Sequence, residues 1–413
     1  MSASSSPMST EPPATGLIRV EDALALIVRH GMELQTGEEL RPPSAATGLR
    51  LAADVHAIVS QPPTAVSAMD GYAVRFVDMA EGNHLKLKGV SRAGEIFEGA
   101  VGPGEAVRIY TGAVVPTGAD HILIQEDAKR DGDKVMVATA QPAPSSIRRK
   151  GLDFEAGDLL APCGQIITPG ALALIGAGNI ADVSVRRPPR IGVLATGDEL
   201  KPAGSSLAPG QIVNSVAPAI LSLAHSWGAE AVDLGTARDD AEDVMRRLAD
   251  DLDVIVSIGG ASVGDFDVVR PAFARAGFEP VFAKVAMKPG KPTWFSRNDR
   301  RLALGLPGNP AAAMVTANLF LRTLIDAMTG ASAPGLSLEG ARTLHPLPAT
   351  GGREEFLRAV VGVGADGVAR VRTADNQDSS LLSPFLTANA LIRRSPRSTP
   401  ANADTLVEIV RMD

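Results

Sequence analysis

The 413-residue sequence contains a single cysteine, Cys163, and this scarcity excludes an intramolecular disulfide and a zinc site built from cysteines. Its six histidines are scattered and show no HExxH-type spacing. A bound metal is therefore expected to be a hard ion such as Mg²⁺, held by oxygen ligands. The net charge is −7, so the chain lacks the basic excess that nucleic-acid partners require.

Long hydrophobic runs suited to a membrane are also lacking. Residues 159–181 carry no charge, but they contain Pro162, Pro169 and several glycines, which favours a turn followed by a short helix. Residues 1–16 are rich in serine, threonine and proline without a basic, apolar signal pattern, and they are interpreted as a disordered leader. With one cysteine and no targeting signal, the sequence indicates a cytoplasmic protein without a membrane partner.

Aromatic residues make up only 4% of the chain, so its cores must be built mainly from alanine, valine, isoleucine and leucine. The length allows roughly two to four domains. Residues 20–35 have apolar side chains at helical spacing, residues 61–148 contain short β-like runs, and residues after 334 form further short strands separated by turns.

Between residues 189 and 333 the pattern alternates between strands and helices. Strands are predicted at 191–196, 231–234, 253–258, 281–285, 293–296 and 302–306, and helices at 217–227, 241–248, 268–276 and 311–328. Such alternation predicts a mainly parallel sheet with helices on both faces. In these sheets ligands bind at the carboxyl ends of the strands, so the loops there are the place to look for chemistry.

Three of these loops carry acids, and two of those also carry glycines. They are Thr196-Gly197-Asp198-Glu199-Leu200, Arg238-Asp239-Asp240, and the run from Gly259 and Gly260 through Ser262 and Gly264 to Asp265 and Asp267. Glycine-rich strand–helix junctions let backbone N–H groups converge on an anion, and nearby carboxylates can hold its metal. The alternatives are acids that cap or begin a helix and, for the third loop, a plain connection. The third loop is neither GxGxxG nor a P-loop.

Two further loops suggest an oxyanion or phosphate. Lys288-Pro289-Gly290-Lys291-Pro292 holds two lysines on a turn stiffened by prolines. Leu306-Pro307-Gly308-Asn309-Pro310 places a good N-cap and a first-turn proline before a helix, so capping alone explains much of it, although it would also leave a helix N-terminus free for an anion. No histidine lies in these loops, so no Ser–His–Asp set is predicted.

These loops, together with Ser67-Ala68-Met69-Asp70-Gly71-Tyr72-Ala73-Val74 and Arg149-Lys150-Gly151-Leu152-Asp153, resemble the motifs of the MoeA/gephyrin E-domain family, the molybdopterin molybdenumtransferases. The likeness runs from about residue 17 to the end and includes Gly352-Arg353 and Gln377-Asp378-Ser379. It implies a multidomain α/β plus β protein. Its parts would be an elongated helical segment (17–60 with 149–188), an inserted β-rich domain (61–148), a central mainly parallel α/β molybdopterin-binding domain (189–333) and a C-terminal β domain (334–413).

The resemblance also implies an activity and its residues. The reaction would insert molybdenum from molybdate into adenylyl-molybdopterin and release AMP, with Mg²⁺ assisting. Catalytic roles fall on Asp153, Glu199, Asp239 and Asp267, and the last three would hold the metal. Substrate-binding roles fall on Thr196, Gly197, Asp198, Gly259, Gly260, Ser262, Gly264, Lys288, Lys291, Pro307, Gly308, Asn309, Pro310, Ser67 and Asp70. A homodimer is implied, with the cleft between the α/β domain of one subunit and the inserted domain of the other.

The sequence departs from the family pattern at two places. Ala65 and Val66 stand where the family usually has Asp-Asn, and Asn214, Ser215 and Val216 stand where it has Asp-Ser/Thr-Asn. An alternative hypothesis is therefore a catalytically weakened paralogue that acts as a molybdopterin-binding scaffold or carrier. Molybdopterin adenylylation and general phosphate-ester hydrolysis are two further alternatives. Contact with a molybdopterin adenylyltransferase or with acceptor molybdoenzymes is a possible partner interaction.

Overall fold

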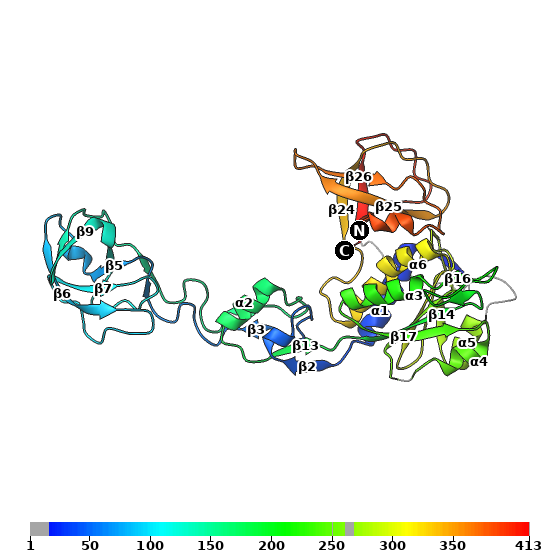
Figure 1. The fold of residues 1–413 in the computed structure, drawn as a ribbon, viewed down its shortest axis with the longest axis horizontal. Helices are drawn as coiled ribbons and strands as arrows, with labels where there is room; N and C mark the ends of the chain where they lie inside the picture. The colour runs from blue at the N-terminus through cyan, green and yellow to red at the C-terminus, as the bar shows by residue number, and fades with distance from the viewer. Residues whose placement is uncertain (1–15, 250, 261–267, 413) are drawn as a thin grey trace, which may run out of the picture. The chain divides into compact units, whose positions relative to one another are not determined.

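The computed structural model describes residues 16–249, 251–260 and 268–412, which form two compact units. One unit contains residues up to 39, residues 48–52 and residues from 185 onward, and the other contains residues 40–47 and 53–184. Figure 1 labels the main elements of both.

The first unit is built on a six-stranded sheet. Its strand order is β17 (Glu230–Ala237), β14 (Arg190–Thr196), β18 (Val254–Ile258), β23 (Leu302–Leu306), β22 (Trp294–Arg297) and β19 (Glu279–Phe282). The first four strands are parallel to one another. At one edge β22 pairs antiparallel with β23, and β19 pairs antiparallel with β22. The prediction of a mainly parallel sheet is confirmed, although residues 281–285 are divided between β19 and β20 (Lys284–Val285).

Helices cover both faces of this sheet (Figure 1). Val193 and Ala195 of β14 pack into the core with α1 (Val20–Glu33), α3 (Val216–Ser226), α6 (Pro310–Thr316) and α7 (Arg322–Met328). Leu194 points into the smaller core with α4 (Ala241–Arg246) and α5 (Val269–Arg275). This alternation follows from the two-residue side-chain period of a strand, and it explains why the central strands are apolar throughout.

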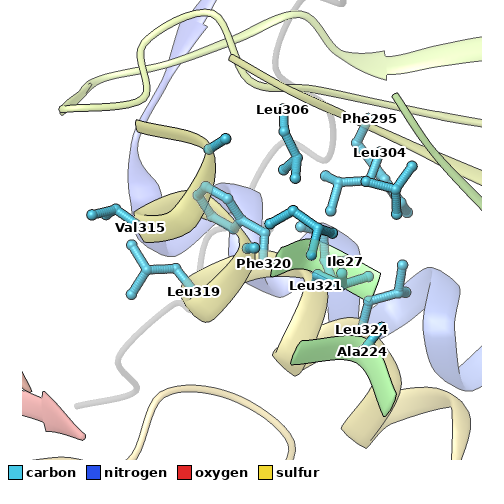
Figure 2. Close-up of a cluster of buried hydrophobic side chains, with 14 of the residues drawn as sticks. Ile27, Ala224, Phe295, Leu304, Leu306, Val315, Leu319, Phe320, Leu321 and Leu324 are labelled. Atoms are coloured by element: carbon cyan, nitrogen blue, oxygen red, sulfur yellow. The ribbon is translucent and has the colours of Figure 1, made fainter. Parts of the chain in front are cut away.

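The helix α1 begins after Arg19, and its first turn carries Glu21 and Asp22, whose charges suit the positive helix end. Its buried side chains include Val20, Ala23 and Ile27, which join the main core of the α/β sheet. Figure 2 shows Ile27 among Leu304, Phe320 and Leu324. Of the predicted linking segment (17–60 with 149–188), residues 17–39, 48–52 and 185–188 fall in the first unit and the others in the second.

The longest apolar helix runs from Pro310 to Met328, with a π-helical turn at Ala317–Leu321 between α6 and α7. Among the described helices it alone is long and apolar enough to cross a membrane by length and composition, and 83% of its apolar window is buried inside the protein. Phe320, Leu321 and Leu324 lie in the core of Figure 2, so burial against the sheet accounts for its composition.

The C-terminal part of the first unit is a closed barrel. Its strands are β25 (Glu354–Val363), β26 (Ala369–Thr373), β24 (Leu338–Thr343), β28 (Leu406–Arg411) and β27 (Ala390–Arg394), and β27 pairs again with β25. Ala359, Val371, Ile392 and Ile409 fill its core. The strand β21 (Met287–Lys288) pairs in parallel with the start of β25, so the lysine loop continues from a strand of this sheet. The C-terminal β-structure predicted from the sequence is confirmed, and closure satisfies its edges.

The second unit contains a six-stranded sheet in the order β8 (His121–Ile124), β5 (Gly71–Val74), β7 (Glu105–Ile109), β6 (His84–Ser91), β10 (Lys134–Val137) and β9 (Ala128–Asp131). The β-like runs predicted within residues 61–148 are strands in the structure. The helix α2 (Pro169–Ala177) begins at Thr168, whose side chain accepts a hydrogen bond from the Ala171 N–H. The uncharged stretch 159–181 therefore contains a short strand at 159–161, a turn and this short helix.

Short elements complete the fold. The two-stranded pairs are β1 (Leu17–Ile18) with β20, β2 (Glu38–Arg41) with β13 (Val183–Arg186), β3 (Val55–His56) with β12 (Leu159–Ala161), β4 (Val66–Ser67) with β11 (Ile147–Arg148), and β15 (Leu200–Lys201) with β16 (Ile212–Val213). Within the described residues, 3₁₀ turns lie at Pro43–Ala45, Phe76–Asp78, Gln125–Asp127 and Ser383–Leu386.

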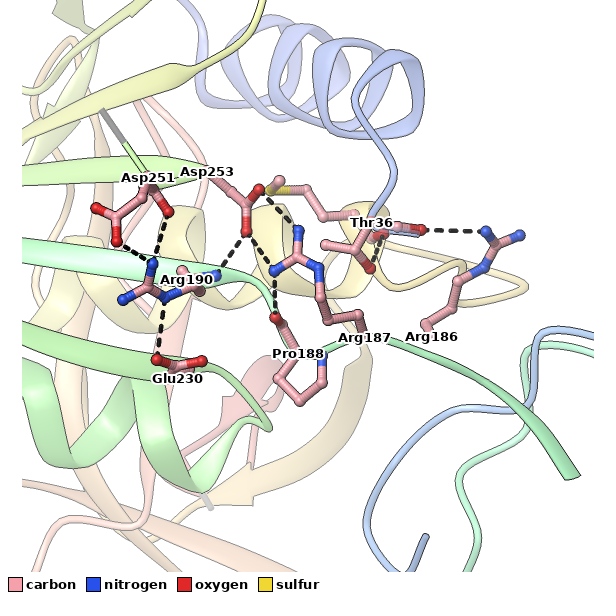
Figure 3. Close-up of polar contacts among 9 residues, drawn as sticks. Thr36, Arg186, Arg187, Pro188, Arg190, Glu230, Asp251 and Asp253 are labelled. Carbon is pink, nitrogen blue, oxygen red and sulfur yellow. Dashed lines mark hydrogen bonds and ion pairs between the residues drawn. The ribbon is translucent and has the colours of Figure 1, made fainter. Parts of the chain in front are cut away.

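Ion pairs hold the amino ends of the parallel strands together (Figure 3). Asp253 accepts two bonds from the Arg187 guanidinium at 2.9 Å each and one from the Arg190 N–H at 2.7 Å. The Arg190 side chain in turn contacts Glu230 and Asp251. The start of β14 is thus tied to the starts of β17 and β18, at the end of the sheet opposite the predicted ligand loops.

We expect Asp253→Ala to lower the free energy of unfolding of this unit by about 2 kcal/mol, because three charge-assisted hydrogen bonds lose their acceptor. Glu230→Gln is the matched control, since Glu230 forms a single, more exposed ion pair with Arg190 and should cost about 0–1 kcal/mol. The midpoints of urea unfolding measure both. Equal shifts in the two variants would contradict a special role for Asp253.

Candidate functional site

A cavity of about 1070 Å³ lies at the carboxyl ends of β14, β18 and β23. Residues from all five predicted loops line it, and each contributes at least one side chain or backbone segment. The described lining includes Thr196, Gly197, Glu199, Asp239, Gly259, Gly260, Lys288, Lys291, Pro307, Gly308, Asn309 and Pro310. The structure therefore brings together most of the site residues predicted from the α/β section.

The floor of the cavity is set by contacts between strand ends. The buried Thr196 hydroxyl donates to the Ile258 carbonyl at 3.2 Å, and the Gly259 N–H donates to the Leu306 carbonyl at 3.2 Å. Gly259 has a φ of +91°, and a Cβ there would lie 2.7 Å from the Thr196 carbonyl oxygen. Only glycine allows β18 to end so close to β14.

Glu199 is an exposed carboxylate whose side chain folds back over Gly197. A Cβ at position 197 would lie 2.5 Å from Glu199 Oε2, and Gly197 has a φ of +149°. The Gly197 N–H also donates to the Ala237 carbonyl at 3.2 Å, which ties this loop to the end of β17. Asp198 is exposed and is not among the described lining residues, so the predicted pair of acids contributes one carboxylate to the cavity.

The acids of the second loop have different positions. Asp240 is the N-cap of α4 and accepts a hydrogen bond from the Glu242 N–H at 3.1 Å, whereas Asp239 lines the cavity. Asp243 holds the loop from below, because it accepts from the Arg238 N–H at 2.9 Å and from the Arg246 guanidinium at 3.0 Å. These two contacts lower the pKa of Asp243 to about 2, so it is charged at neutral pH.

The lysine loop is rigid at its base, while its lysine side chains are exposed. Thr293 donates to the Gly290 carbonyl from both its hydroxyl (2.7 Å) and its N–H (3.1 Å), and the Lys291 carbonyl accepts from the Val285 N–H. Lys288 Nζ lies 3.7 Å from Glu355 Oε1 and its side chain is 57% exposed. Among the described residues, Lys291 has no ion pair. Both amines are therefore available to an anion in the cavity.

Asn309 stands at the N-cap of α6, but its side chain does not cap the helix. Its amide Nδ2 donates to Ser379 Oγ at 2.9 Å, and the Ser379 carbonyl accepts the Ala311 N–H at 2.9 Å. The prediction that the Asn309 side chain caps the helix is therefore wrong. The prediction of an entirely free helix N-terminus is also wrong, because the Ala311 N–H is already bonded to Ser379. A loop of the barrel supplies the acceptor that the asparagine was expected to provide.

Several lining residues were not predicted as site residues. Arg353 comes from the start of the barrel, and Gln377, Asp378, Ser379 and Ser380 come from the loop after β26. Hydrogen bonds from Ser380 lower the pKa of Asp378, which keeps this carboxylate ionised. Both stretches belonged to the family resemblance, and that was the one signal that marked them. Asn214, Ser215 and Val216, where the sequence departs from the family pattern, also line the cavity.

Three predicted residues belong to the second unit and are not among the described lining residues. The buried Ser67 hydroxyl donates to the Met69 carbonyl at 2.6 Å. Asp70 accepts from the Thr111 N–H and hydroxyl, both at 2.8 Å, and these contacts lower its pKa. Asp153 is exposed, and its N–H donates to the Gln61 carbonyl.

Ser262, Gly264, Asp265 and Asp267 lie outside the described residues. Within residues 16–249, 251–260 and 268–412, no cluster of three or more His, Cys, Asp or Glu side chains could hold a metal ion. Glu199 and Asp239 both line the cavity, however. Mg²⁺ commonly uses one or two carboxylates together with substrate phosphates, so this pair fits such an ion by its donor chemistry.

Comparisons with known proteins agree over most of the chain. Residues 18–178 match the MoeA N-terminal region (domains I and II), residues 192–327 match a probable molybdopterin binding domain, and residues 340–411 match the MoeA C-terminal region (domain IV). A Haemophilus influenzae protein named molybdopterin molybdenumtransferase is 33% identical over 349 residues, covering 83% of this chain and 85% of the relative. A Nostoc protein of the same name is 33% identical over 332 residues, covering 77% of this chain and 76% of the relative.

Solved structures give the same relationship. Two crystal structures of molybdopterin biosynthesis MoeA protein from Pyrococcus horikoshii have TM-scores of 0.79 and 0.75, with 27% and 26% sequence identity. Each covers 96% of this chain, and the match spans 99% and 100% of those chains.

We expect Gly197→Ala to weaken binding in the cavity while the fold survives. The added Cβ would force Glu199 out of its position, and the φ of +149° would add backbone strain of about 1–3 kcal/mol. Gly204→Ala is the control, because Gly204 also has a positive φ (+85°) but has open space around its Cβ position and does not line the cavity. Anion binding can be measured by calorimetry with molybdate. An equal loss in both variants would show that strain alone is responsible.

Proposed function

Because this chain belongs to the molybdopterin molybdenumtransferase (MoeA) family of molybdenum cofactor biosynthesis, we propose that it inserts molybdenum from molybdate into adenylyl-molybdopterin and releases AMP. The observation that carries the proposal is the charge arrangement in one cavity. Lys288, Lys291 and Arg353 line it together with Glu199 and Asp239, so an anion and a metal-bound phosphate can be held in the same space.

Lys288 and Lys291 would reduce the electrostatic repulsion between the two substrates. Molybdate is a dianion and the adenylate carries further negative charge, so the two repel each other unless positive groups screen them. Lys288 and Lys291 are exposed on a rigid turn, which lets them approach an oxyanion without reorganising the loop. We assign molybdate to these lysines, and the phosphate oxygens to the Pro307–Pro310 loop beside them.

The chemistry has two parts. Two Mo–S bonds form when the dithiolene sulfurs replace an oxide of molybdate, which leaves with the thiol protons as water. The P–O bond of the phosphoanhydride breaks by addition of water, and AMP leaves with the oxygen that bridged the two phosphates. In this proposal the lysines and the Pro307–Pro310 loop bind and orient the two anions, and Glu199 and Asp239 would hold the Mg²⁺ that neutralises the phosphates.

The expected cofactor is Mg²⁺. Glu199 and Asp239 would hold it, with Asp267 as the third predicted ligand. When bound, the ion would neutralise charge on the anhydride oxygens as a Lewis acid. Homodimer formation and site roles for Ser67, Asp70 and Asp153 stay predictions of the family resemblance.

The second candidate is a weakened paralogue that binds molybdopterin as a scaffold or carrier. The observation that favours it is Ala65, which stands where the family usually has aspartate. The two candidates differ in turnover, since a carrier would bind the pterin tightly without releasing AMP.

The first test is AMP release from adenylyl-molybdopterin by the purified protein with Mg²⁺, in the presence and absence of molybdate. We expect release that depends on molybdate, with a product that activates a molybdoenzyme lacking its cofactor. Tight pterin binding without AMP release would instead support the carrier. In that case Ala65→Asp should create activity that the natural chain lacks.

Lys288→Ala should raise the KM for molybdate roughly 10- to 100-fold, because a charge-assisted contact to the dianion is lost. Lys284→Ala is the matched control, since it removes the same charge from β20 at a residue that does not line the cavity. An unchanged dependence on molybdate in Lys288→Ala would remove the role assigned to this lysine.

Asp239→Asn should raise the Mg²⁺ concentration needed for half-maximal AMP release roughly tenfold or more, since an amide replaces a charged ligand. The neighbouring Asp240→Asn is the control, because asparagine can still cap α4 and Asp240 does not line the cavity. Titrations of Mg²⁺ with both variants separate the two roles, and a similar shift in each would argue against Asp239 as a metal ligand.

A further inference from the structure

Arg358, in the middle of β25, is almost completely buried, with 1% of its surface exposed. Among the described residues no carboxylate forms an ion pair with its guanidinium. Burial lowers the pKa of Arg358, but an arginine keeps its proton in proteins. A buried guanidinium is costly unless its N–H groups are satisfied, so the contacts that satisfy it show what the residue holds in place.

Among the described residues, all of its side-chain hydrogen-bond acceptors lie in one short segment, residues 376–381. Nη1 donates to the Leu381 carbonyl at 2.7 Å, and Nη2 donates to the carbonyls of Asp378 at 2.9 Å and Asn376 at 3.3 Å. Nε donates to Gln377 Oε1 at 3.3 Å. One rigid, planar group therefore gathers the carbonyls of a turn that has no regular secondary structure.

The Gln377 side chain also binds the turn to the backbone of β25. Its Oε1 accepts from the Arg358 N–H at 3.0 Å, and its Nε2 donates to the carbonyls of Arg358 at 2.9 Å and Ala374 at 3.0 Å. The ring of Phe385 lies 5.7 Å from the guanidinium carbon and covers its face. The segment is thus fixed to β25 by hydrogen bonds from both directions.

The same segment forms a wall of the cavity. Gln377, Asp378, Ser379 and Ser380 line it, and Ser379 also forms hydrogen bonds with the Asn309 amide and the Ala311 N–H in the adjoining segment. Displacement of this turn would therefore move polar groups in both segments together. Arg358 does not line the cavity itself, so its influence on a bound molecule must pass through the turn.

We propose that Arg358 is a positioning residue, which fixes the Asn376–Leu381 turn and through Ser379 the Asn309 side of the cavity. For substrate effects this inference rests on the proposed molybdenum transfer. The wall would contact the substrate equally in the ground state and in the transition state. Loss of Arg358 therefore weakens the binding of both states by the same amount, which raises KM and leaves kcat nearly unchanged. A residue needed only for barrel stability would change neither constant of the folded enzyme.

The test compares Arg358→Met with Arg394→Met in the full chain. Arg394 is also a buried barrel arginine, but its Nη2 donates to the Thr399 carbonyl at 2.7 Å, in a segment that does not line the cavity. Amide hydrogen exchange without any ligand is measured over residues 309–313 and 376–382, and KM and kcat are measured in the AMP-release assay. We expect exchange in both segments to accelerate roughly tenfold or more in Arg358→Met alone, with a raised KM.

Three results would overturn the proposal. They are unchanged exchange in Arg358→Met, faster exchange without a change in KM, and the same changes in Arg394→Met. If Arg358→Met does not fold, Arg358→Lys replaces it, and we expect the same acceleration because one ammonium cannot gather four acceptors. Wild-type exchange restored by lysine would contradict the geometric role. Failure of wild-type AMP release would overturn the proposed function, while the exchange comparison would still decide whether Arg358 fixes the turn.

Discussion

The common direction of β17, β14, β18 and β23 is the constraint on which the cavity depends. Parallel strands place all their carboxyl ends at one edge, so loops that are distant in the sequence must meet there. Ile258 pairs with Leu306 at this edge, and the bond from Thr196 to the Ile258 carbonyl joins the third strand end to them. Close approach of the strand ends explains the glycine at position 259, since a side chain there would collide with the Thr196 backbone.

In the part of the chain that the structure describes, charged side chains are paired at the amino ends of the parallel strands and largely unpaired at the carboxyl ends. At the amino ends, Arg187, Arg190 and Asp253 satisfy one another, which stabilises the strands and leaves little charge for a ligand. At the carboxyl ends, Lys288 and Lys291 are exposed and weakly paired or unpaired among the described residues, and Glu199 is exposed. Uncompensated positive charge of this kind suits the anions that the proposed function requires.

The sequence predicted the α/β section well because local periodicity determines strands and helices, and the parallel order then places their loops. Thr196, Asp239 and Lys288 were assigned to one site on that basis, and the structure brings them together. Local pattern could not identify the partner of Asn309, because Ser379 lies 70 residues away and the contact depends on barrel packing. Local pattern also could not decide which of the adjacent residues Asp239 and Asp240 belongs to the site. The structure decides it, because Asp240 caps α4.

The pairing of β21 with β25 has a consequence for how the site is made during synthesis. A nascent chain that ends near residue 330 has the parallel sheet and the lysine loop, but the strand that leads into this loop has no partner. Arg353 and the 377–380 wall are also absent until later residues emerge. The sheet can therefore fold first, and the cavity is completed only when the barrel docks. A partly synthesised chain therefore lacks the complete set of groups that line the cavity.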